Sequence, residues 1–315
     1  MATIENFIEE WHNGKPYIKA HTSGSTGKPK EILLAKSDML ASAKATNEFF
    51  NIKADSCLAL PLSIDYIAGK MMVVRAIEAG CELIPLNVSN NIIIPDEIKK
   101  IDLLPVVPSQ IDSLIQNKKY ASKIKNLLIG GAAPSPCQCA GLSDAGYNWF
   151  ISYGMTETCS HVALADSFGS KRVFCAMPGI SFDTDEQNRL LIIAPGFSFK
   201  RLQTNDIVEL LSPKKFIWKG RADNVINSGG LKLHPEELEN QFRKYLPGIV
   251  FYLTSGKSLK WGSELVMVVE GKEDSGYLLS VLEEAGIESK YLPKRVICYN
   301  KLPRTSSFKI IRQKF

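Results

Sequence analysis

The residues with the clearest chemical potential form a short polar loop, residues 21–30, with the sequence His-Thr-Ser-Gly-Ser-Thr-Gly-Lys-Pro-Lys. Its glycines let backbone N–H groups come close to an anion, its hydroxyl groups add donors, and its lysines add positive charge. This composition predicts a phosphate-binding loop, although it also fits a flexible Ser/Gly hairpin loop. The expected phosphate-binding residues are Thr22, Ser23, Gly24, Ser25, Thr26, Gly27, Lys28 and Lys30.

The loop is not a Walker A motif. Only two residues separate Gly24 from Gly27, and Pro29 follows Lys28 where a Walker A motif has Ser or Thr. The apolar run at residues 32–34 also favours a strand after the loop, where a P-loop protein has a helix. A P-loop NTPase is therefore disfavoured.

Four further motifs follow the loop in a characteristic order. They are Tyr153-Gly154-Met155-Thr156-Glu157, Thr204-Asn205-Asp206, Gly220-Arg221-Ala222-Asp223-Asn224 with Ser228-Gly229-Gly230, and Leu302-Pro303-Arg304-Thr305 leading to Lys309. With the loop, they resemble the adenylate-forming superfamily of acyl-CoA synthetases, nonribosomal adenylation domains and luciferases. The resemblance covers residues 21–312 and implies ATP, Mg²⁺ and coenzyme A as a co-substrate.

The resemblance gives the Tyr153 motif a role in nucleotide binding. Tyr153 offers a ring that can stack on a purine, Thr156 a hydroxyl group for the α-phosphate, and Glu157 a hard oxygen ligand suited to Mg²⁺. Thr156 and Glu157 are the expected catalytic residues of this segment, and Gly154 and Met155 complete it. Alone, the same five residues fit a strand that runs into a capped helix.

Two other segments match the nucleotide site of the superfamily. Gly130, Gly131 and Ala132 resemble its adenine-edge turn, where the missing side chains let the base lie on the backbone; a tight turn would need the same glycines. Asp206 is expected to accept hydrogen bonds from both ribose hydroxyl groups. On its own, Asp206 fits a turn residue at the start of a strand.

The C-terminal motifs imply a second, movable domain. Arg221 matches the ribose-phosphate arginine and Asp223 the hinge position, although a polar linker would mark the same boundary. Lys309 matches the catalytic lysine that neutralises charge at the α-phosphate and carboxylate during adenylation. Without the other motifs it would be a solvated charge. The residues that match the loop approaching the pantetheine of coenzyme A are Ser228, Gly229, Gly230 and Lys232.

The acid-binding pocket is expected where two regions of the chain meet. His161 follows the Tyr153 motif, with Ser160 before it, and Lys70 and Arg75 lie on a predicted helix. In the superfamily these regions line the acyl pocket, so a cation or imidazole there could receive a second carboxylate. A satisfied structural histidine and solvent-facing cations are the alternatives.

Within the superfamily, residues 153–161 and 66–72 are most similar to o-succinylbenzoate:CoA ligases of menaquinone biosynthesis. The resemblance implies that a carboxylate attacks the α-phosphate of Mg·ATP, after which the small domain turns at Asp223 and coenzyme A displaces AMP. The alternatives are another small-acid CoA ligase, an adenylation enzyme that loads a carrier protein, and a degenerate nucleotide-binding protein. Three departures from the superfamily pattern favour the last alternative: Glu31, Asn205 and above all Phe308 stand where glycine is common.

The elements that must position these residues change in type along the chain. Between residues 17 and 152, short apolar runs alternate with amphipathic stretches, which predicts an α/β layer with a partly parallel sheet. Met39, Ala43, Thr46 and Phe50 recur at helical spacing after a possible N-cap at Ser37. Short runs after residue 185 predict antiparallel strands, and residues 234–299 predict a compact α+β unit.

The expected fold is therefore an adenylate-forming enzyme fold. Residues 1–220 form a large α/β domain with mixed sheets and helices, shortened at its N-terminus and binding ATP and the acid, and residues 221–315 form a small, mobile α+β domain.

Composition excludes several other classes. Of 315 residues, 45% are hydrophobic and 23% charged, which predicts a folded globular chain and not a disordered one. A net charge of +5 is too small for a nucleic-acid tract but fits polyanionic small molecules. Seven cysteines without a framework spacing predict a reducing, cytoplasmic location. We expect no signal peptide, no membrane span and no structural metal, whereas an oligomer is compatible with the sequence.

Overall fold

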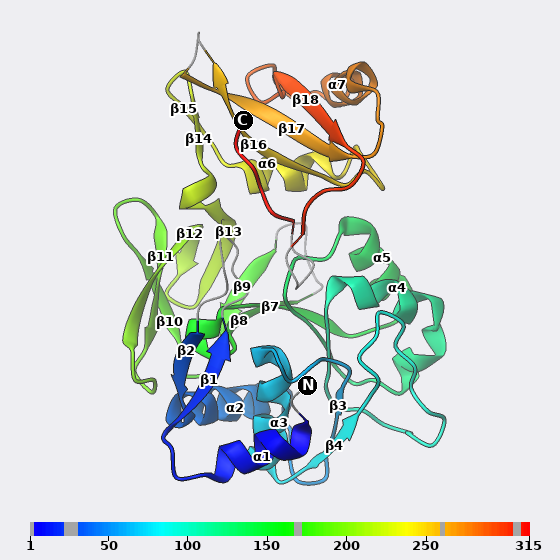
Figure 1. Ribbon diagram of the computed structural model, residues 1–315, viewed down its shortest axis with the longest axis vertical. Coiled ribbons are helices and arrows are strands. Elements are labelled where there is room, and N and C mark those ends of the chain that lie inside the picture. The colour runs from blue at the N-terminus through cyan, green and yellow to red at the C-terminus, as the bar shows by residue number, and fades with distance from the viewer. Residues whose placement is uncertain (1–2, 22–30, 167–171, 259–261, 305–309) are drawn as a thin grey trace. The chain divides into compact units, whose positions relative to one another are not determined.

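The computed structural model describes residues 3–21, 31–166, 172–258, 262–304 and 310–315, which fall into two compact units (Figure 1). Unit 1 comprises Met1–Asp183, Leu191–Leu202 and Leu210–Ile217, and unit 2 comprises Thr184–Leu190, Gln203–Glu209 and Trp218–Phe315. The long continuous part of unit 2 begins at Trp218. The domain boundary expected between residues 220 and 221 stays a prediction.

Helices and strands alternate through the first half of the chain, as predicted. They are α1 (Ile4–His12), β1 (Tyr17–His21), β2 (Glu31–Ala35), α2 (Lys36–Phe50), β3 (Cys57–Leu60), α3 (Ile67–Ala79), β4 (Glu82–Pro85), β5 (Leu104–Val106), α4 (Pro108–Gln116), β6 (Leu127–Ile129), α5 (Pro136–Asp144) and β7 (Trp149–Gly154). Two 3₁₀ turns also belong to this part, η1 (Lys118–Ser122) and η2 (Thr156–Thr158). Among the described residues, no helix is both long and apolar enough to cross a bilayer.

A nine-stranded sheet joins β5, β6 and β7 to the strands that follow, whereas β1 pairs with β2 and β3 with β4 in separate two-stranded sheets. The later strands are β8 (His161–Asp166), β9 (Val173–Ala176), β10 (Ser181–Thr184), β11 (Arg189–Ala194), β12 (Lys200–Ser212) and β13 (Lys215–Arg221). The strand order is β10-β11-β12-β13-β9-β8-β7-β6-β5. The pairs β5–β6 and β6–β7 are parallel, whereas β7–β8, β8–β9 and β9–β13 are antiparallel. The predicted mixed sheet is therefore confirmed.

Parallel pairing brings two predicted site segments to one edge of this sheet. Residues 127–129 of β6 pair with residues 149–151 of β7, so that Gly130 directly follows β6 next to Ser152 of β7. All three residues of β6 are buried, as is typical of a strand that is covered on both faces. The carboxyl ends of β6 and β7 consequently present the glycine turn and the Tyr153 motif at the same edge.

Helices α2 and α3 lie side by side in unit 1 (Figure 1). The positions that predicted α2 by their spacing, Met39, Ala43, Thr46 and Phe50, are all buried. The predicted N-cap is wrong by two residues, because α2 begins at Lys36 and Ala35 occupies the cap position without a side-chain hydrogen bond. The residues that cap the C-terminal ends of α2 and α3, Asn51 and Gly80, adopt the left-handed conformation that commonly ends a helix.

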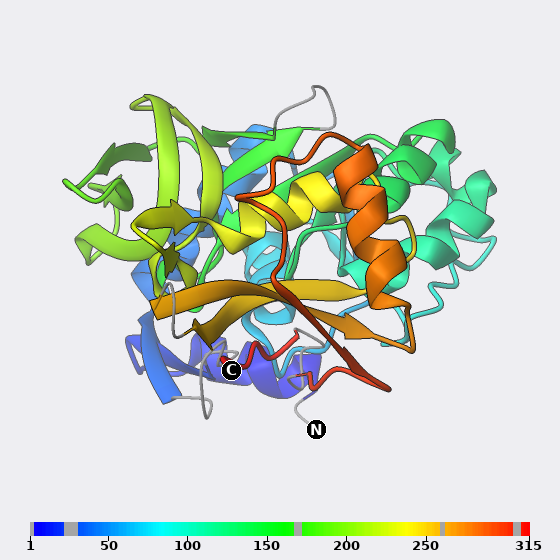
Figure 2. The ribbon, with the colours of Figure 1, turned by 90° about the horizontal axis from the view of Figure 1, so that it is seen from above.

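Unit 2 contains a three-stranded sheet with a helical face. Its strands are β16 (Phe251–Ser258), β17 (Gly262–Glu270) and β18 (Arg295–Tyr299), in that order, and its helices are α6 (Pro235–Phe242) and α7 (Ser275–Glu284). Figure 2 shows both helices on the same face of the sheet. Side chains that alternate along β16 and β17 separate into two buried groups: Phe251, Leu253 and Met267 pack with the helices, and Tyr252, Val266 and Val268 pack with Leu302, Ile310 and Phe315.

The last residues of the chain, residues 310–315, lie along β16 (Figure 1). The backbone N–H of Phe315 donates to the carbonyl of Ser255 at 3.0 Å, and its carbonyl accepts from Lys257 N–H at 2.6 Å. The Thr254 hydroxyl group donates to the Gln313 carbonyl at 2.8 Å. The chain end thus continues the hydrogen-bonding pattern of this sheet beyond β16.

Candidate active site

The predicted phosphate loop lies outside the described residues, as does Lys309. The structure describes the strands on either side of the loop, β1 and β2, which pair antiparallel from Tyr17 opposite Ala35 to His21 opposite Glu31. The segment 22–30 therefore connects the two strands of a β-hairpin. The phosphate-binding roles of Thr22–Lys30 and the catalytic role of Lys309 stay predictions.

Local backbone structure explains the glycines in the turn after β6. Gly131 adopts a φ of +82°, in the left-handed region that favours glycine. A Cβ atom on Gly130 would lie 3.1 Å from the Ser152 hydroxyl oxygen, which donates to the Ile129 carbonyl at 2.9 Å. A tight turn thus explains both glycines, and it leaves their expected adenine contact, shared with Ala132, as a prediction.

The Tyr153 motif is a strand that ends in a single 3₁₀ turn. β7 ends at Gly154 and η2 spans Thr156–Thr158, so the strand runs into a short 3₁₀ helix, as the alternative for these five residues alone expected. The Thr158 hydroxyl group lies 3.1 Å from the Met155 backbone N–H and 2.7 Å from the Ser160 carbonyl, which keeps the turn compact. The turn leaves the Thr156 side chain half-buried and the Glu157 carboxylate exposed.

The exposed Glu157 carboxylate fits a magnesium ion that accompanies a nucleotide. Mg²⁺ in such sites is bound by one or two carboxylates together with substrate phosphates and waters. Residues 3–21, 31–166, 172–258, 262–304 and 310–315 contain no group of three or more His, Cys, Asp or Glu side chains that could hold a metal ion by itself. Binding of Mg²⁺ by Glu157 stays a prediction.

The Tyr153 ring lies beside two buried aromatic rings. Its centroid is 5.1 Å from that of Phe216, edge to face, and 5.7 Å from that of Phe174. These contacts orient the half-buried tyrosine ring at the end of β7. Stacking of Tyr153 on a purine stays a prediction.

Gly154 allows a close approach between β7 and the start of β8. A Cβ atom at this position would lie 2.3 Å from the Ser160 carbonyl oxygen and 2.6 Å from the His161 Cα atom. The register between the two strands shifts at Tyr153 and Gly154, and Cys159 adopts a φ of +62°, which is strained for a residue other than glycine. This irregular corner aims Ser160 and His161 at α2 and α3.

The structure brings three of the four predicted acid-binding residues together. The Arg75 Nη2 atom on α3 donates to the Ser160 hydroxyl oxygen at 2.5 Å, and that oxygen lies 3.2 Å from His161 Nδ1. His161 Nε2 lies 3.2 Å from the Thr46 hydroxyl oxygen on α2. Arg75, Ser160, His161 and Thr46 thus form one hydrogen-bonded row, called the Arg75 row below.

Arg75 is a buried cation without an acidic partner among the described residues. Its side chain is only 2% exposed, its Nη1 atom contacts only the Met72 sulfur, at 3.4 Å, and its Nε atom has no hydrogen-bond partner. Burial lowers the pKa of Arg75 to about 9, which still leaves the guanidinium charged at neutral pH. Two of its nitrogens are therefore available to an additional acceptor.

The surroundings of His161 favour its neutral form. Burial first, and then the nearby Arg75 charge, lower the pKa of His161 well below its usual range. Both ring nitrogens are already engaged, by Ser160 and by Thr46. The imidazole thus supports Arg75 through Ser160, and its expected contact with the acid stays a prediction.

Lys70, the fourth predicted acid-binding residue, does not belong to the hydrogen-bonded row of Arg75. Its ammonium group is 3.8 Å from the Glu10 carboxylate and 4.9 Å from the centre of the Phe7 ring, both on α1, and 3.4 Å from the Lys19 carbonyl oxygen. These contacts connect α3 to α1 and to β1. The structure thus places Lys70 away from the Arg75 row, although both residues belong to α3.

The predicted ribose ligand Asp206 lies within β12 and not at a turn. It is 7% exposed and accepts a hydrogen bond from Trp218 Nε1 at 3.0 Å. Arg221 lies 3.9 Å from the Asp206 carboxylate and 2.7 Å from that of Asp223. Arg221 thus lies next to both Asp206 and the proposed hinge residue.

The predicted pantetheine loop is a tight hairpin in unit 2. β14 (Ile226–Ser228) pairs antiparallel with β15 (Leu231–Leu233), and Gly229 and Gly230 connect them with φ of +58° and +84°. Two consecutive positive φ values are typical of a type I′ turn, which explains both glycines. Lys232 is exposed on β15, and contact with coenzyme A stays a prediction.

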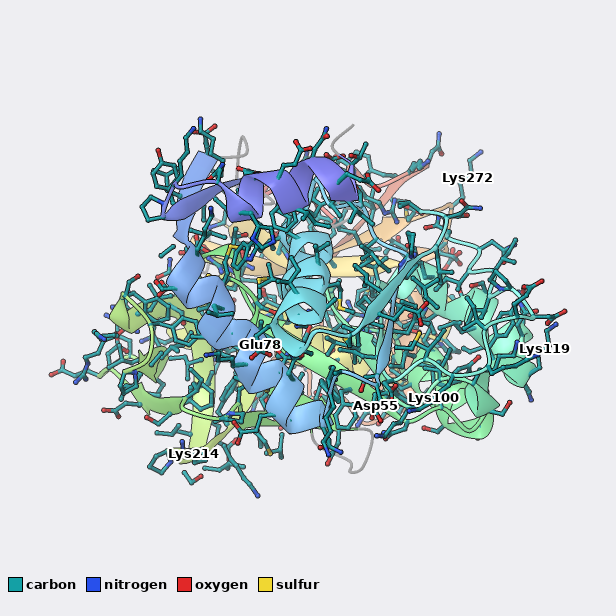
Figure 3. All side chains as sticks on the ribbon, turned by 90° about the horizontal axis from the view of Figure 1, so that it is seen from below. Asp55, Glu78, Lys100, Lys119, Lys214 and Lys272 are labelled. Carbon is teal, nitrogen blue, oxygen red and sulfur yellow. The ribbon has the colours of Figure 1, made fainter. Side chains whose placement is uncertain are left out.

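Sequence reasoning missed two polar residues of α2 that support Arg75. Thr46 lies next to His161, and the Asn47 amide donates to the Arg75 carbonyl at 3.0 Å and to the Glu78 carboxylate at 2.6 Å. Figure 3 labels Glu78 where α2 and α3 lie side by side. The only signal in the sequence is that Thr46 and Asn47 are polar residues on the apolar side of a predicted helix.

Comparisons with known proteins agree with this geometry. The family model described as AMP-binding enzyme matches residues 6–183. A crystal structure of an acyl-CoA synthetase (AMP-forming)/AMP-acid ligase II-like protein from Dyadobacter fermentans is 31% identical, covering 97% of this chain and 90% of that chain with a TM-score of 0.64.

Two further proteins match most of the chain at lower identity. A 2-succinylbenzoate–CoA ligase from Enterococcus faecalis is 26% identical, over 94% of this chain and 68% of the relative. The o-succinylbenzoate coenzyme A synthetase from Bacillus subtilis, solved with ATP and magnesium, shares the fold with a TM-score of 0.79 at 20% identity, covering 93% of this chain and 68% of that chain. The family model covers more than half of the residues, and the chain belongs to the AMP-binding enzyme family.

Proposed function

We propose that this chain is an ATP-dependent acid–CoA ligase that converts o-succinylbenzoate into o-succinylbenzoyl-CoA through an acyl adenylate. Family membership supports the adenylating chemistry, and the names of the Enterococcus and Bacillus relatives support the acid. The observation that carries the choice of acid is the buried Arg75 guanidinium beside the Tyr153 motif.

A dicarboxylic acid explains why a cation is buried at this place. A buried charge is costly unless it is paired and hydrogen-bonded, and Arg75 has no acidic partner in the described part of the chain. A carboxylate can accept two parallel hydrogen bonds from one guanidinium. One carboxylate of o-succinylbenzoate would therefore pair with Arg75, while the other is activated.

The reaction has two displacement steps. In the first, an oxygen of the activated carboxylate attacks the α-phosphorus of ATP, and pyrophosphate leaves with the electron pair of the broken P–O bond. In the second, the thiolate sulfur of coenzyme A attacks the acyl carbonyl carbon, and AMP leaves. Holding the reactants in line contributes about 7 to 11 kcal/mol in well-oriented reactions.

The predicted nucleotide-site residues act in the first step. The phosphate loop, with Thr26 and Lys28, binds the β- and γ-phosphates, and Glu157 would hold Mg²⁺, which would neutralise phosphate charge. Thr156 and Lys309 stabilise the charge that develops at the α-phosphate. Tyr153 stacks on the adenine ring at the turn of residues 130–132. Asp206 and Arg221 bind the ribose and its phosphate.

The second step uses residues of the C-terminal part. Residues 1–220 bind ATP and the acid, and residues 221–315 form a domain that rotates at Asp223 between the two steps. Rotation removes Lys309 from the α-phosphate and brings the Gly229–Gly230 turn and Lys232 to the pantetheine of coenzyme A. A single domain thereby serves both half-reactions.

Pyrophosphate release measured with two acids tests the proposal. The acids are o-succinylbenzoate and the matched keto acid that lacks the ring carboxylate, each with coenzyme A added and omitted. Arg75→Met should lower kcat/KM for the dicarboxylate at least about 30-fold, because a charge-assisted hydrogen bond of roughly 2 kcal/mol or more is lost. It should change the keto acid little. Lys44→Met, which removes an exposed cation from α2, is the matched control and should change neither acid.

Other outcomes would assign the chain differently. Equal turnover of the two acids by the wild type would exclude the dicarboxylate assignment and leave another small-acid CoA ligase. Pyrophosphate release without consumption of coenzyme A would favour an enzyme that loads a carrier protein. ATP binding without release of pyrophosphate for any acid would favour a non-catalytic nucleotide-binding protein.

A further inference from the structure

We propose that Thr46 is a positioning residue that fixes the tautomer of His161 and thereby the direction in which Ser160 meets Arg75. The inference rests on the proposed function, because it treats Arg75 as the residue that receives the spare carboxylate of the acid. It adds three side chains to that function and gives each a defined hydrogen-bond direction.

The donor and acceptor roles along the Arg75 row are set by a hydrogen bond to the backbone of α2. The Thr46 hydroxyl group donates to the Ser42 carbonyl at 2.9 Å, within the helix. A hydroxyl group has one proton, so its oxygen can only accept from His161 Nε2 at 3.2 Å. The Nε2 atom must then carry the imidazole proton.

The remaining bonds follow from this assignment. A neutral imidazole with its proton on Nε2 has only an acceptor at Nδ1. The Ser160 hydroxyl group therefore donates to Nδ1 at 3.2 Å, which leaves its oxygen lone pairs to accept from Arg75 Nη2 at 2.5 Å. The bonds run in one direction from Arg75 to the Ser42 carbonyl.

The opposite tautomer would conflict with the hydrogen bond of Thr46. With the proton on Nδ1, His161 would donate to the Ser160 oxygen, and Nε2 would present a lone pair to the Thr46 oxygen, whose proton is already donated to the Ser42 carbonyl. Among the described residues, the Ser160 hydroxyl oxygen is the only oxygen to which the Arg75 side chain donates a hydrogen bond. Thr46 excludes this arrangement although it does not touch Arg75.

The arrangement leaves a defined part of Arg75 for the ligand. Among the described residues, Nη2 donates to Ser160, Nη1 donates only to the weak acceptor Met72 Sδ, and Nε has no partner. Nη2 has a second proton, and the Nε proton lies on the same edge of the guanidinium group, so a carboxylate that accepts from Nε and Nη2 in parallel would satisfy Nε. Loss of the Thr46 hydroxyl group should therefore weaken binding of the dicarboxylate without removing any atom that contacts it.

The experiment compares three substitutions on α2 in the full chain. Thr46→Val removes the hydroxyl group and keeps the shape, whereas Thr46→Ser keeps the hydroxyl group. Ser42→Ala is the control, since it removes a buried hydroxyl group that has no partner and leaves the carbonyl in place. The first readout is the ¹⁵N resonances of the His161 ring without any acid, assigned with His161→Gln.

We expect the wild type, Thr46→Ser and Ser42→Ala to show one neutral tautomer with the proton on Nε2. Thr46→Val should show a mixture of tautomers. In turnover, Thr46→Val should raise KM for o-succinylbenzoate roughly two- to tenfold, with kcat little changed and KM for the matched keto acid unaffected, as expected for one neutral hydrogen bond. Comparing the two acids in one preparation removes the effect of any loss of folded protein.

Two results would overturn the inference. If Thr46→Val keeps the Nε2 proton, the tautomer does not depend on Thr46. If KM rises equally for both acids, Thr46 acts only through packing. Failure of the wild type to use o-succinylbenzoate would instead overturn the proposed function, and the ring resonances would still decide the assignment of the tautomer.

Discussion

The Arg312 guanidinium binds the Glu239 carboxylate with two nitrogens. Nη2 lies 2.8 Å from Oε2, and Nη1 bonds to Oε1 and, at 2.9 Å, to the Leu253 carbonyl. Glu239 is 1% exposed and also accepts from the Leu253 N–H at 2.7 Å. Because Arg312 lies three residues after Lys309 in the sequence, this pair holds the chain next to the predicted catalytic lysine.

Glu239→Gln should destabilise the protein because it removes a buried carboxylate that pairs with two half-buried cations, Arg312 and Arg243. Breaking such a pair costs about 3 to 5 kcal/mol, whereas an exposed pair is worth less than about 1 kcal/mol. The free energy of unfolding in urea checks the first value, and Glu264→Gln, which breaks the more exposed pair with Arg295, is the control. In the folded fraction, pyrophosphate release should slow more than thioester formation from a supplied acyl adenylate. Equal slowing of pyrophosphate release and thioester formation would show that Arg312 does not act through Lys309.

Arg75→Met should stabilise the protein while it impairs use of the dicarboxylate. The substitution removes a buried charge that has no acidic partner among the described residues, and replacing buried ionic groups with apolar ones of similar size often gains about 1 to 4 kcal/mol. The pKa of Arg75 is lowered by burial to about 9 in the folded protein and is well above that value in the unfolded chain, so the gain should be complete below pH 9. Above that pH it should shrink, because the folded wild type then releases the proton first.

Urea unfolding of the wild type and of Arg75→Met at several pH values measures this gain. A loss of stability at neutral pH would mean that the hydrogen bond to Ser160 outweighs the cost of the buried charge. Saturating dicarboxylate should stabilise the wild type more than the variant, since a ligand stabilises the state that binds it.

His161→Gln should make the protein less sensitive to acid. The pKa of His161 lies well below 6.5 in the folded protein, so between those two values the unfolded chain binds a proton that the folded protein does not. Wild-type stability should therefore fall as the pH drops below 6.5, by at most about 1.4 kcal/mol per pH unit for this one group. The variant should lack this contribution to the slope. Urea titrations from pH 7 to 5 measure it, and parallel slopes would contradict the burial of a neutral imidazole.

Gly154→Ala should disturb the corner between β7 and β8. The added methyl group would lie 2.3 Å from the Ser160 carbonyl oxygen, so the backbone would have to shift, at a cost of about 1 to 3 kcal/mol. Gly196→Ala is the control, because nothing lies within 4 Å of a Cβ atom there. Gly154→Ala should lower the free energy of unfolding in urea and slow pyrophosphate release. An unchanged Gly154→Ala protein would show that this corner adapts freely.

Local signals predicted most of the secondary structure. Helical spacing in α2, buried apolar runs in β5 and β6, and Pro235 at the start of α6 each indicated the observed element, because burial on one face or on both imposes a period on the sequence. The N-cap at Ser37 was wrong because α2 follows β2 without an intervening loop. The chain there needs no capping side chain to begin a helix.

Contacts between distant residues could not be predicted in the same way. Arg75 and Ser160 are 85 residues apart, and Arg312 and Glu239 are 73 apart, so only the folded backbone shows that they meet. The neutral state of His161 depends on burial beside Arg75, which no residue spacing specifies. Lys70 and Arg75 looked alike in the sequence, and their different surroundings on α3 separate them.

Trp218 provides an optical signal at the proposed ribose site. Its indole N–H donates to the Asp206 carboxylate, the group that would also accept from the ribose hydroxyl groups. A nucleotide that takes over this acceptor would change the hydrogen bonding and polarity around the indole ring. Fluorescence emission from Trp218 should then report nucleotide occupancy without a label, at a residue that the chemistry itself does not require.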